Sequence, residues 1–387
     1  MRETCRGRGQ VRIVYNAMVL KEPYSGVEII VHQMADAFSR YGTLPICACL
    51  PRKHRPVSET VRLKLYPAAD WASRSRLMRI LWEQTVLPVF LARTHATLLH
   101  APAYVSPVLS PVPVVLTIHD LYVMTHPQFC RHRNRAHYNL FIPRSIHRAS
   151  AIITFSEYMR RTIETRFPEA EDRIVVVPPG LTPGLARCED FNRLQTLRQK
   201  YKLPSFFLLF VGDMSRRKNL QGLISAFAIV QAERPDLHLI LAGAATPETA
   251  AEVDSIVRSY GIGHRVRRIG YVESENLATL YSLAQAFVFP SHDEGFGLPP
   301  LEAMACGCPV VCSGGAPVEN CGEAAVSCDP RDVTSIAGGV SMLLDNPSIR
   351  KEKVRLGYEA AARFTWEGAV RRTESVSRAV GEGRMGL

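Results

Sequence analysis

Short runs of β-branched residues alternate with helical segments along most of this chain. Residues 11–19 (VRIVYNAMV) are of strand type, and residues 27–42 carry apolar positions at helical spacing and end at Gly42. A turn-rich loop with Gly26 lies between them. A strand, a glycine-containing loop and a helix form the opening unit of a doubly wound domain. The pattern therefore predicts an α/β fold.

The alternation occurs in two series, separated by a segment at 181–204 that contains Pro183 and Pro204. Before it, we expect strands at 96–102, 113–120, 149–156 and 173–180 and helices at 138–148 and 157–167. After it, we expect strands at 205–213, 237–244, 266–272, 286–291 and 309–313 and helices at 219–234, 249–261, 302–307 and 335–346. A last helix begins near Thr365.

The length of 387 residues is more than one ordinary core accommodates, which favours two domains. We predict an N-terminal Rossmann-like domain at 1–190, a second at 191–364, and a closing helix at 365–387. Ligands of open α/β sheets bind beyond the carboxyl ends of the strands. Two such domains in tandem predict a binding cleft between them.

Composition narrows the class of partner without choosing one. The net charge of +11 suits anionic ligands such as phosphorylated substrates or acidic lipids, although solubility alone also explains it. No apolar run reaches the roughly 18–20 residues of a membrane span, and the N-terminus lacks a hydrophobic signal core. We therefore expect a cytoplasmic protein. Ten cysteines include no C-x2-C pair, so we expect reduced thiols and no metal site.

The most informative stretch is FPSHDEGFGLPPLEAMACGCPVV at 289–311. A strand leads into a polar loop with Glu294, and glycines permit close approach of a ligand. Pro299 and Pro300 mark a helix start, whose exposed N–H groups bind anions. We place Glu302 in the first turn, where it accepts hydrogen bonds from hydroxyls. Taken alone, Glu302 would be interpreted as a carboxylate at a helix start and Glu294 as a solvated loop charge. Their occurrence together with the glycines and prolines, in this order, favours a functional site instead.

This stretch resembles the E-x7-E signature of the GT4 family of retaining glycosyltransferases, with Glu294 and Glu302 as its two glutamates. The resemblance implies a GT-B fold, whose terminal helix crosses back to the N-terminal domain. It also implies that Glu294 lies near the donor sugar, that Glu302 binds the ribose, and that the loop between them meets the diphosphate. The implied contacts of that loop are Gly295, Phe296, Gly297 and Leu298.

A second stretch, FVGDMSRRKNL at 210–220, carries three cations between a strand and a helix. Arginine grips phosphate oxygens in a fork, and lysine supplies a point charge. A cluster of three cations by itself is more often a solvated surface cluster or a patch that binds nucleic acid. It resembles the G-x-L-x-P-R-K-N motif of the same family, with Arg216 in place of proline. The resemblance implies that Gly212, Arg217 and Lys218 bind the donor diphosphate. Without a D-x-D pair, these cations replace a divalent metal.

Two further stretches belong to the N-terminal half. LTIHDLYVMTHP at 116–127 places His119 and Asp120 directly after a strand and resembles the family's TIHDL motif. A lone histidine there is more often structural; the resemblance assigns His119 to the donor sugar, and we assign Asp120 to the acceptor side. Gly26 stands in Ser25-Gly26-Val27, where relatives carry two glycines, and is the implied diphosphate contact.

These resemblances predict a hexosyltransferase that needs no cofactor and uses a nucleotide-diphosphate sugar as co-substrate. We assign His119 and Glu294 as catalytic, with Glu294 as a charge stabiliser. The expected acceptor is a glycan or lipid-linked oligosaccharide, and mannose is the sugar that the Arg-Lys-Asn subgroup favours. The arginine-rich segment 131–148 predicts contact with anionic headgroups on the inner face of the membrane, or else a solvated helix face.

The alternatives are a nucleotide-sugar epimerase, a sugar phosphorylase, and a sugar-nucleotide-binding partner subunit without turnover. An epimerase needs no acceptor, a phosphorylase needs free phosphate, and a partner subunit binds donor without transfer. A nucleic-acid partner is not expected, because no recognised nucleic-acid module occurs in the sequence.

Overall fold

The computed structural model describes residues 11–21, 26–51, 60, 63–129 and 132–385. The chain forms two compact units, of which unit 1 comprises residues 1–180 and 365–387 and unit 2 comprises residues 181–364. Each unit is built on its own parallel sheet. The fold class predicted from the alternation of strands and helices, two Rossmann-like α/β domains, is confirmed.

The sheet of unit 1 has seven strands in the order β3-β2-β1-β4-β5-β6-β7, all parallel. The strands are β1 (Ile13–Asn16), β2 (Ile46–Pro51), β3 (Leu63–Ala68), β4 (Leu98–Ala101), β5 (Val114–Thr117), β6 (Ala151–Thr154) and β7 (Ile174–Val176). The central strands β1, β4, β5 and β6 are buried at every position. Continuous apolar runs are what parallel strands covered on both faces require.

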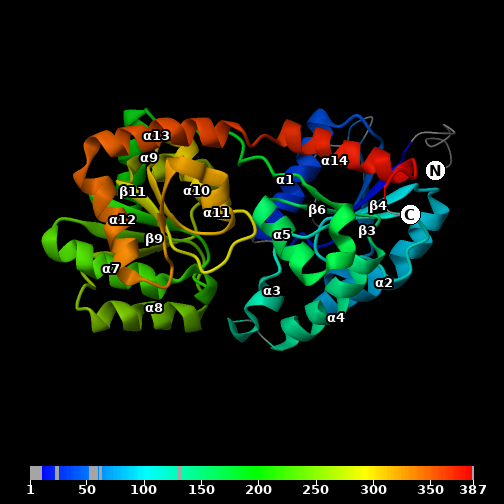
Figure 1. The fold of residues 1–387 in the computed structure, drawn as a ribbon, viewed down its shortest axis with the longest axis horizontal. Coiled ribbons are helices and arrows are strands. Elements are labelled where there is room, and N and C mark those ends of the chain that lie inside the picture. Colours follow the sequence, from blue (N-terminus) through cyan, green and yellow to red (C-terminus); the bar gives the residue numbers. More distant parts are fainter. Residues whose placement is uncertain (1–10, 22–25, 52–59, 61–62, 130–131, 386–387) are drawn as a thin grey trace. The chain divides into compact units, whose positions relative to one another are not determined.

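Helices cover this sheet (Figure 1). They are α1 (Gly26–Tyr41), α2 (Arg76–Arg93), α3 (Tyr122–Thr125), α4 (His132–Arg148), α5 (Glu157–Arg166) and α14 (Trp366–Gly381). Side chains of α2, α4 and α5 share one core cluster, including Trp82, Ile142 and Met159. The final helix, α14, packs against α1, and its Glu374 accepts hydrogen bonds from the backbone N–H groups of Thr43 and Leu44. The last helix therefore belongs to unit 1.

The sheet of unit 2 has six parallel strands in the order β10-β9-β8-β11-β12-β13. They are β8 (Phe207–Val211), β9 (His238–Ala242), β10 (Val266–Gly270), β11 (Ala286–Phe289), β12 (Val310–Ser313) and β13 (Ala325–Cys328). The order reverses direction between β8 and β11, which makes these two strands the switch point of the sheet. Loops that follow strands at such a point form the usual ligand site.

The helices of unit 2 lie in two layers. Those on one side include α7 (Leu220–Glu233), α8 (Pro247–Ser259) and α12 (Val333–Asp345), and those on the other include α6 (Phe191–Tyr201), α9 (Ser274–Leu283), α10 (Leu298–Ala305) and α13 (Pro347–Ala362) (Figure 1). The short α11 (Ala316–Cys321) packs against α10 and α13. Three-residue 3-10 turns precede α7 at Arg216–Lys218 and β13 at Gly322–Ala324.

The segment 181–204 differs from expectation in two respects. The segment 181–204, expected as a connection, contains helix α6, because Asp190 caps its start by accepting from the N–H groups of Asn192 and Arg193. Residues 181–190, which we assigned to the first domain, belong to unit 2. Thr182 bonds to Glu302, and the N–H of Cys188 bonds to Ser282. The boundary therefore lies at Gly180 rather than at residue 190.

Candidate functional site in unit 2

A buried cluster of charges lies where β8 and β11 end. The loop after β8 supplies Arg217 and Lys218 from the 3-10 turn, and the loop after β11 supplies Glu294. One oxygen of the Glu294 carboxylate accepts from Arg217 Nη1 at 2.6 Å, and the other accepts from Lys218 Nζ at 2.7 Å. All three residues were predicted from two separate motifs; the fold brings them together.

The electrostatics of this cluster keep Glu294 ionised. Burial alone would raise the pKa of Glu294, but the charges of Arg217 and Lys218 outweigh burial and lower it. Burial, assisted by the charge of Arg217, lowers the pKa of Lys218, while Glu294 opposes that shift. The ammonium of Lys218 also lies 4.8 Å from the centroid of the Phe289 ring, a cation–π contact. Glu294 therefore holds two cations in place rather than carrying a proton.

Arg216 takes no part in this cluster. Its side chain is exposed and pairs with Glu252 of α8. The three consecutive cations that look equivalent in the sequence thus divide into one surface residue and two site residues. Such exposed pairs contribute at most about 1 kcal/mol.

Asn219 connects the two loops, a role that was not predicted from the sequence. Its side-chain amide donates to the carbonyls of Pro290 and Pro330, at 3.0 and 2.6 Å, and its oxygen accepts from the N–H of Gly222 to cap α7. Its φ of 54° is left-handed, which asparagine tolerates better than most residues. The N–H of His292 also donates to the Arg217 carbonyl. The Asn after the Arg-Lys pair was the available signal.

Helix α10 begins directly after the second loop. Gly297 is its N-cap with φ 86°, and a Cβ at this position would lie 2.9 Å from Pro317. Asn320 donates to the Phe296 carbonyl at 2.7 Å and anchors the turn. Pro299 and Pro300 occupy the first turn, as predicted, so the prolines cost no backbone hydrogen bond.

Glu302 is not in the first turn of α10, where we expected it. The helix starts at Leu298, which places Glu302 in the second turn. Its buried carboxylate accepts from Thr182 Oγ1 at 2.6 Å and lies 3.5 Å from the Tyr281 hydroxyl. Burial raises the pKa of Glu302, and the bond from Thr182 opposes that shift. No cation is paired with it among the described residues, and both of its oxygens face hydroxyl groups.

The remaining donor-side residues surround these charges. Gly295 and Gly297 are buried, and Leu298 is partly exposed at the helix start. The ring of Phe296 packs edge-on against Phe364 at 5.3 Å, so its side chain serves the core of unit 2. Gly212 directly follows β8, and its carbonyl oxygen lies 1.8 Å from where a Cβ on Gly243 would stand. Two strand ends therefore approach closely beside the cluster.

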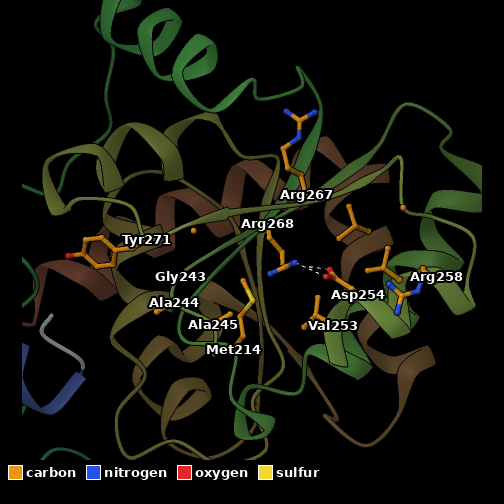
Figure 2. Close-up of a pocket in the computed structure, with 14 residues that line it drawn as sticks. Met214, Gly243, Ala244, Ala245, Val253, Asp254, Arg258, Arg267, Arg268 and Tyr271 are labelled. Carbon is orange, nitrogen blue, oxygen red and sulfur yellow. Dashed lines mark hydrogen bonds and ion pairs between the residues drawn. The ribbon is translucent and has the colours of Figure 1, made fainter. Parts of the chain in front are cut away.

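A pocket of about 750 Å³ opens next to Gly243, between α8 and β10 (Figure 2). Met214, Ala244 and Tyr271 border it at the strand ends. Figure 2 shows Arg268 of β10 pointing to Asp254 of α8, and their closest atoms are 2.7 Å apart. This volume falls within the usual range for small-molecule sites. The pocket was not predicted, because its lining comes from helix α8, strand β10 and four loops without a shared motif.

Unit 1 places His119 and Asp120 at the end of β5. His119 Nε2 lies 2.6 Å from the Pro102 carbonyl, so the ring proton of the neutral form resides on Nε2 and Nδ1 is the acceptor. Burial lowers the pKa of His119, although the Pro102 bond and Asp120 oppose that shift. The Asp120 carboxylate accepts from the N–H of Tyr122 and from the Tyr104 hydroxyl. Asp120 therefore organises the loop around His119.

Gly26 is the exposed first residue of α1, and no atom lies within 4 Å of the point where a Cβ on it would stand. Packing within unit 1 does not require a glycine at this site. Ser25, which precedes Gly26, lies outside the described residues.

The described residues include no group of three or more His, Cys, Asp or Glu side chains placed to hold a metal ion. The clustered cysteines are free thiols in the core, and burial raises the pKa of Cys306 to about 12. In the part of the chain that the structure describes, no helix is both long and apolar enough to cross a bilayer.

Comparison with known proteins identifies the family of this chain. Residues 195–363 match the model of "Glycosyl transferases group 1", and residues 24–184 match that of "Glycosyltransferase Family 4". The chain is 35% identical over 263 residues to the O-antigen chain mannosyltransferase B of Escherichia coli, covering 67% of this chain and 68% of that protein. It is 30% identical over 223 residues to the serotype-specific mannosyltransferase WbdA of Escherichia coli, but that match spans only 27% of WbdA.

Solved structures share the architecture. The sucrose-phosphate synthase of Thermosynechococcus elongatus superposes with a TM-score of 0.76 at 20% identity, over 97% of this chain and 100% of that one. WaaG, a glycosyltransferase involved in lipopolysaccharide biosynthesis, superposes with a TM-score of 0.72 at 15% identity, over 94% and 99%. At these identities the likeness concerns the fold, which is GT-B.

Proposed function

The chain belongs to the group 1 glycosyltransferases of family 4, and from that premise we propose that it transfers mannose from GDP-mannose to a saccharide acceptor with retention at the anomeric carbon. The acceptor is a glycan or lipid-linked oligosaccharide of polysaccharide biosynthesis. The mannosyltransferase of 35% identity supports the choice of sugar. The observation that carries the proposal is the buried cluster of Arg217, Lys218 and Glu294 at the ends of β8 and β11.

The cluster suits a diphosphate leaving group. When the bond from anomeric carbon to phosphate breaks, negative charge develops on the diphosphate oxygens. Arg217 and Lys218 stabilise that charge, assisted by the exposed N–H groups at the start of α10. Because both cations are already held by Glu294, little reorganisation is needed at the moment of reaction. A divalent metal is not part of this proposal.

The remaining residues orient the donor. Glu302 accepts from the ribose hydroxyls, and the pocket between α8 and β10 offers room for the nucleoside. His119 Nδ1 accepts a hydrogen bond from a hydroxyl of the donor sugar, because Nε2 donates to the Pro102 carbonyl. With Glu294 ionised and paired, the departing phosphate takes the acceptor proton on the same face of the sugar. The protein supplies position and charge rather than a covalent nucleophile.

A thermal-shift panel of sugar nucleotides on wild type and Glu302→Ala tests the donor site. A ligand at 100 times its Kd adds about 2.7 kcal/mol to stability. GDP-mannose should raise the melting temperature of wild type and not that of Glu302→Ala. No shift with any sugar nucleotide or nucleoside diphosphate would overturn the donor site.

Turnover is tested by acceptor-dependent release of GDP, with NMR of the new anomeric proton and excess EDTA as a metal control. The expected product is the α-mannoside, formed equally with EDTA. Conversion without an acceptor would identify an epimerase, a requirement for phosphate a phosphorylase, and binding without turnover a partner subunit.

Peripheral contact with anionic membrane belongs to the same proposal. Helix α2 exposes Leu77, Leu81 and Val89, at spacings of four and eight residues, and ends at Arg93. Arg135 and Arg144 of α4 are also exposed. Apolar side chains beside cations are typical of surfaces that lie on acidic lipids. Vesicle flotation should show binding that weakens as salt rises; absent or salt-insensitive binding would remove this part of the proposal.

A further inference from the structure

A small polar recess lies in unit 1 beyond the ends of β1 and β4. Its walls come from Asn16, the last residue of β1, from Arg79 and Glu83 of α2, from the segment after β4, and from His137 and Tyr138 of α4. The recess has a volume of about 10 Å³. That is enough for a single group the size of a water molecule.

Glu83 is the unusual residue of this recess. It lies on the face of α2 that also carries the buried side chains of Trp82 and Leu87, and only 9% of its surface is exposed. One carboxylate oxygen accepts from the Asn16 amide at 3.2 Å. Burial raises the pKa of Glu83, although Arg79 and Asn16 oppose that shift. A carboxylate so deeply placed costs stability unless its oxygens are hydrogen-bonded.

Arg79 faces the same recess with a donor that the protein does not use. Its Nε is buried and has no hydrogen-bond partner in the described part of the chain. The distance from Nε to the nearer Glu83 oxygen is 3.9 Å, which is too long for a hydrogen bond. The recess therefore presents one acceptor and one donor, one helical turn apart on α2, to a space for one group.

This pair of neighbours selects the chemistry of the group. A hydroxyl donates one hydrogen bond and accepts others, so it satisfies Glu83 and Arg79 together. A phosphate or carboxylate would be repelled by Glu83, and an ammonium by Arg79. His137, which also lines the recess, is neutral, because burial and the charges of Arg76 and Arg79 lower its pKa to about 4. The site thus suits a neutral polyol.

The side chain of Tyr104 lies between the recess and His119. Tyr104 lies between Ala103 and Val105, both of which line the recess. The Tyr104 ring centroid is 5.2 Å from that of His119 and 5.5 Å from that of Tyr138. Tyr104 holds this position with a left-handed φ of 65°, which is uncommon outside functional sites and turns.

We propose that this recess binds one hydroxyl of the saccharide acceptor, with Glu83 accepting its hydrogen bond and Arg79 Nε donating to its oxygen. The inference rests on the proposed glycosyltransferase function and extends it by naming specificity residues on the acceptor side. Tyr104 then sets the spacing between that hydroxyl and the donor sugar near His119. An acceptor without the hydroxyl leaves both buried groups unpaired, a strong basis for discrimination.

The test compares the parent acceptor with a set of its monodeoxy analogues on wild type, Glu83→Gln and Arg79→Met. Removing the charge-assisted bonds should lower kcat/KM for the parent acceptor about fivefold in Glu83→Gln and about tenfold in Arg79→Met. The loss should appear in KM for the acceptor. KM for the donor and slow donor hydrolysis by water should not change. Arg166→Met of α5 and Glu169→Gln, both exposed in unit 1, are the matched controls.

The deciding result is a coupling between one hydroxyl and these side chains. One deoxy analogue should lose about tenfold in wild type and almost nothing further in either variant, as a double-mutant cycle requires. If every analogue keeps its wild-type penalty in both variants, Glu83 and Arg79 only fix α2 to β1, and the inference is overturned. If donor hydrolysis falls as much as transfer to the acceptor in either variant, the inference is likewise overturned. Failure of wild type to transfer to any saccharide would instead overturn the proposed function itself.

Discussion

Replacing Glu294 by glutamine should destabilise unit 2 and at the same time increase its response to nucleoside diphosphate. In wild type one buried carboxylate separates two cations, with bonds of 2.6 and 2.7 Å. Glutamine keeps the shape but removes the charge that Arg217 and Lys218 both bind, and Asp213 is then the nearby carboxylate that offsets them. Removing one member of a buried ion pair costs about 3–5 kcal/mol. For a unit of this size, this loss corresponds to a fall of roughly 10 °C in melting temperature.

A bound diphosphate should restore the missing negative charge. If the variant binds GDP about tenfold more tightly, its stabilisation at a given high GDP concentration exceeds that of wild type by about 1.4 kcal/mol. Turnover should nevertheless fall, because the cations are no longer held in position. The assay is thermal unfolding with and without GDP, combined with acceptor-dependent GDP release.

The matched control is Glu252→Gln, which removes the carboxylate partner of exposed Arg216 in the same loop. It should change stability by at most about 1 kcal/mol and leave the GDP response unaltered. The pH dependence gives a second check. Because the folded-state pKa of Glu294 lies below its ordinary 4.5, its contribution is present above that pH and is lost as the pH falls through the folded value. The reasoning is refuted if Glu294→Gln is as stable as wild type, or if GDP stabilises it less than wild type.

Three further predictions concern single residues. Glu302→Gln should be at least as stable as wild type at pH 7, because burial raises the pKa of Glu302. The same variant should bind GDP-mannose at least about tenfold more weakly, measured by calorimetry. Unchanged affinity would contradict the ribose contact. Burial lowers the pKa of His100 to about 3, so the folded state resists protonation. The free energy of unfolding therefore decreases as the pH is lowered below about 6.5. His100→Asn should reduce the slope of the unfolding free energy between pH 6 and 4 by about 1.4 kcal/mol per pH unit relative to wild type. Equal slopes in the two proteins would remove this account. Gly297→Ala should lower the free energy of unfolding, measured with urea, by at least about 1–2 kcal/mol. The causes are the left-handed φ at this position and the clash of a Cβ with Pro317. An unchanged free energy would show that the turn before α10 relaxes freely.

Local patterns were sufficient for the fold class and for most of the elements. The central strands carry continuous apolar runs, and Ser156, Asn219 and Thr365 cap the helices that follow them. Such signals act over a few residues, and the sequence displays them directly. Strands β2, β3 and β13 and helices α2 and α13 were not predicted. Strand β3 and helix α2 mix exposed and buried positions without a clear period.

The sequence by itself determined which residue types were available for the chemistry: the two glutamates, the Arg-Lys pair and the prolines that start α10. Only the tertiary structure decided how they combine. The turn after β8 directs Arg216 to the surface and its two neighbours to Glu294, although 76 and 77 residues separate the bonded partners. It also set Glu302 one turn deeper than expected and placed Glu83 and Arg79 at one recess. The physical reason is that hydrogen bonding and burial depend on neighbours in space, and parallel sheets bring together strand ends that are distant in the chain.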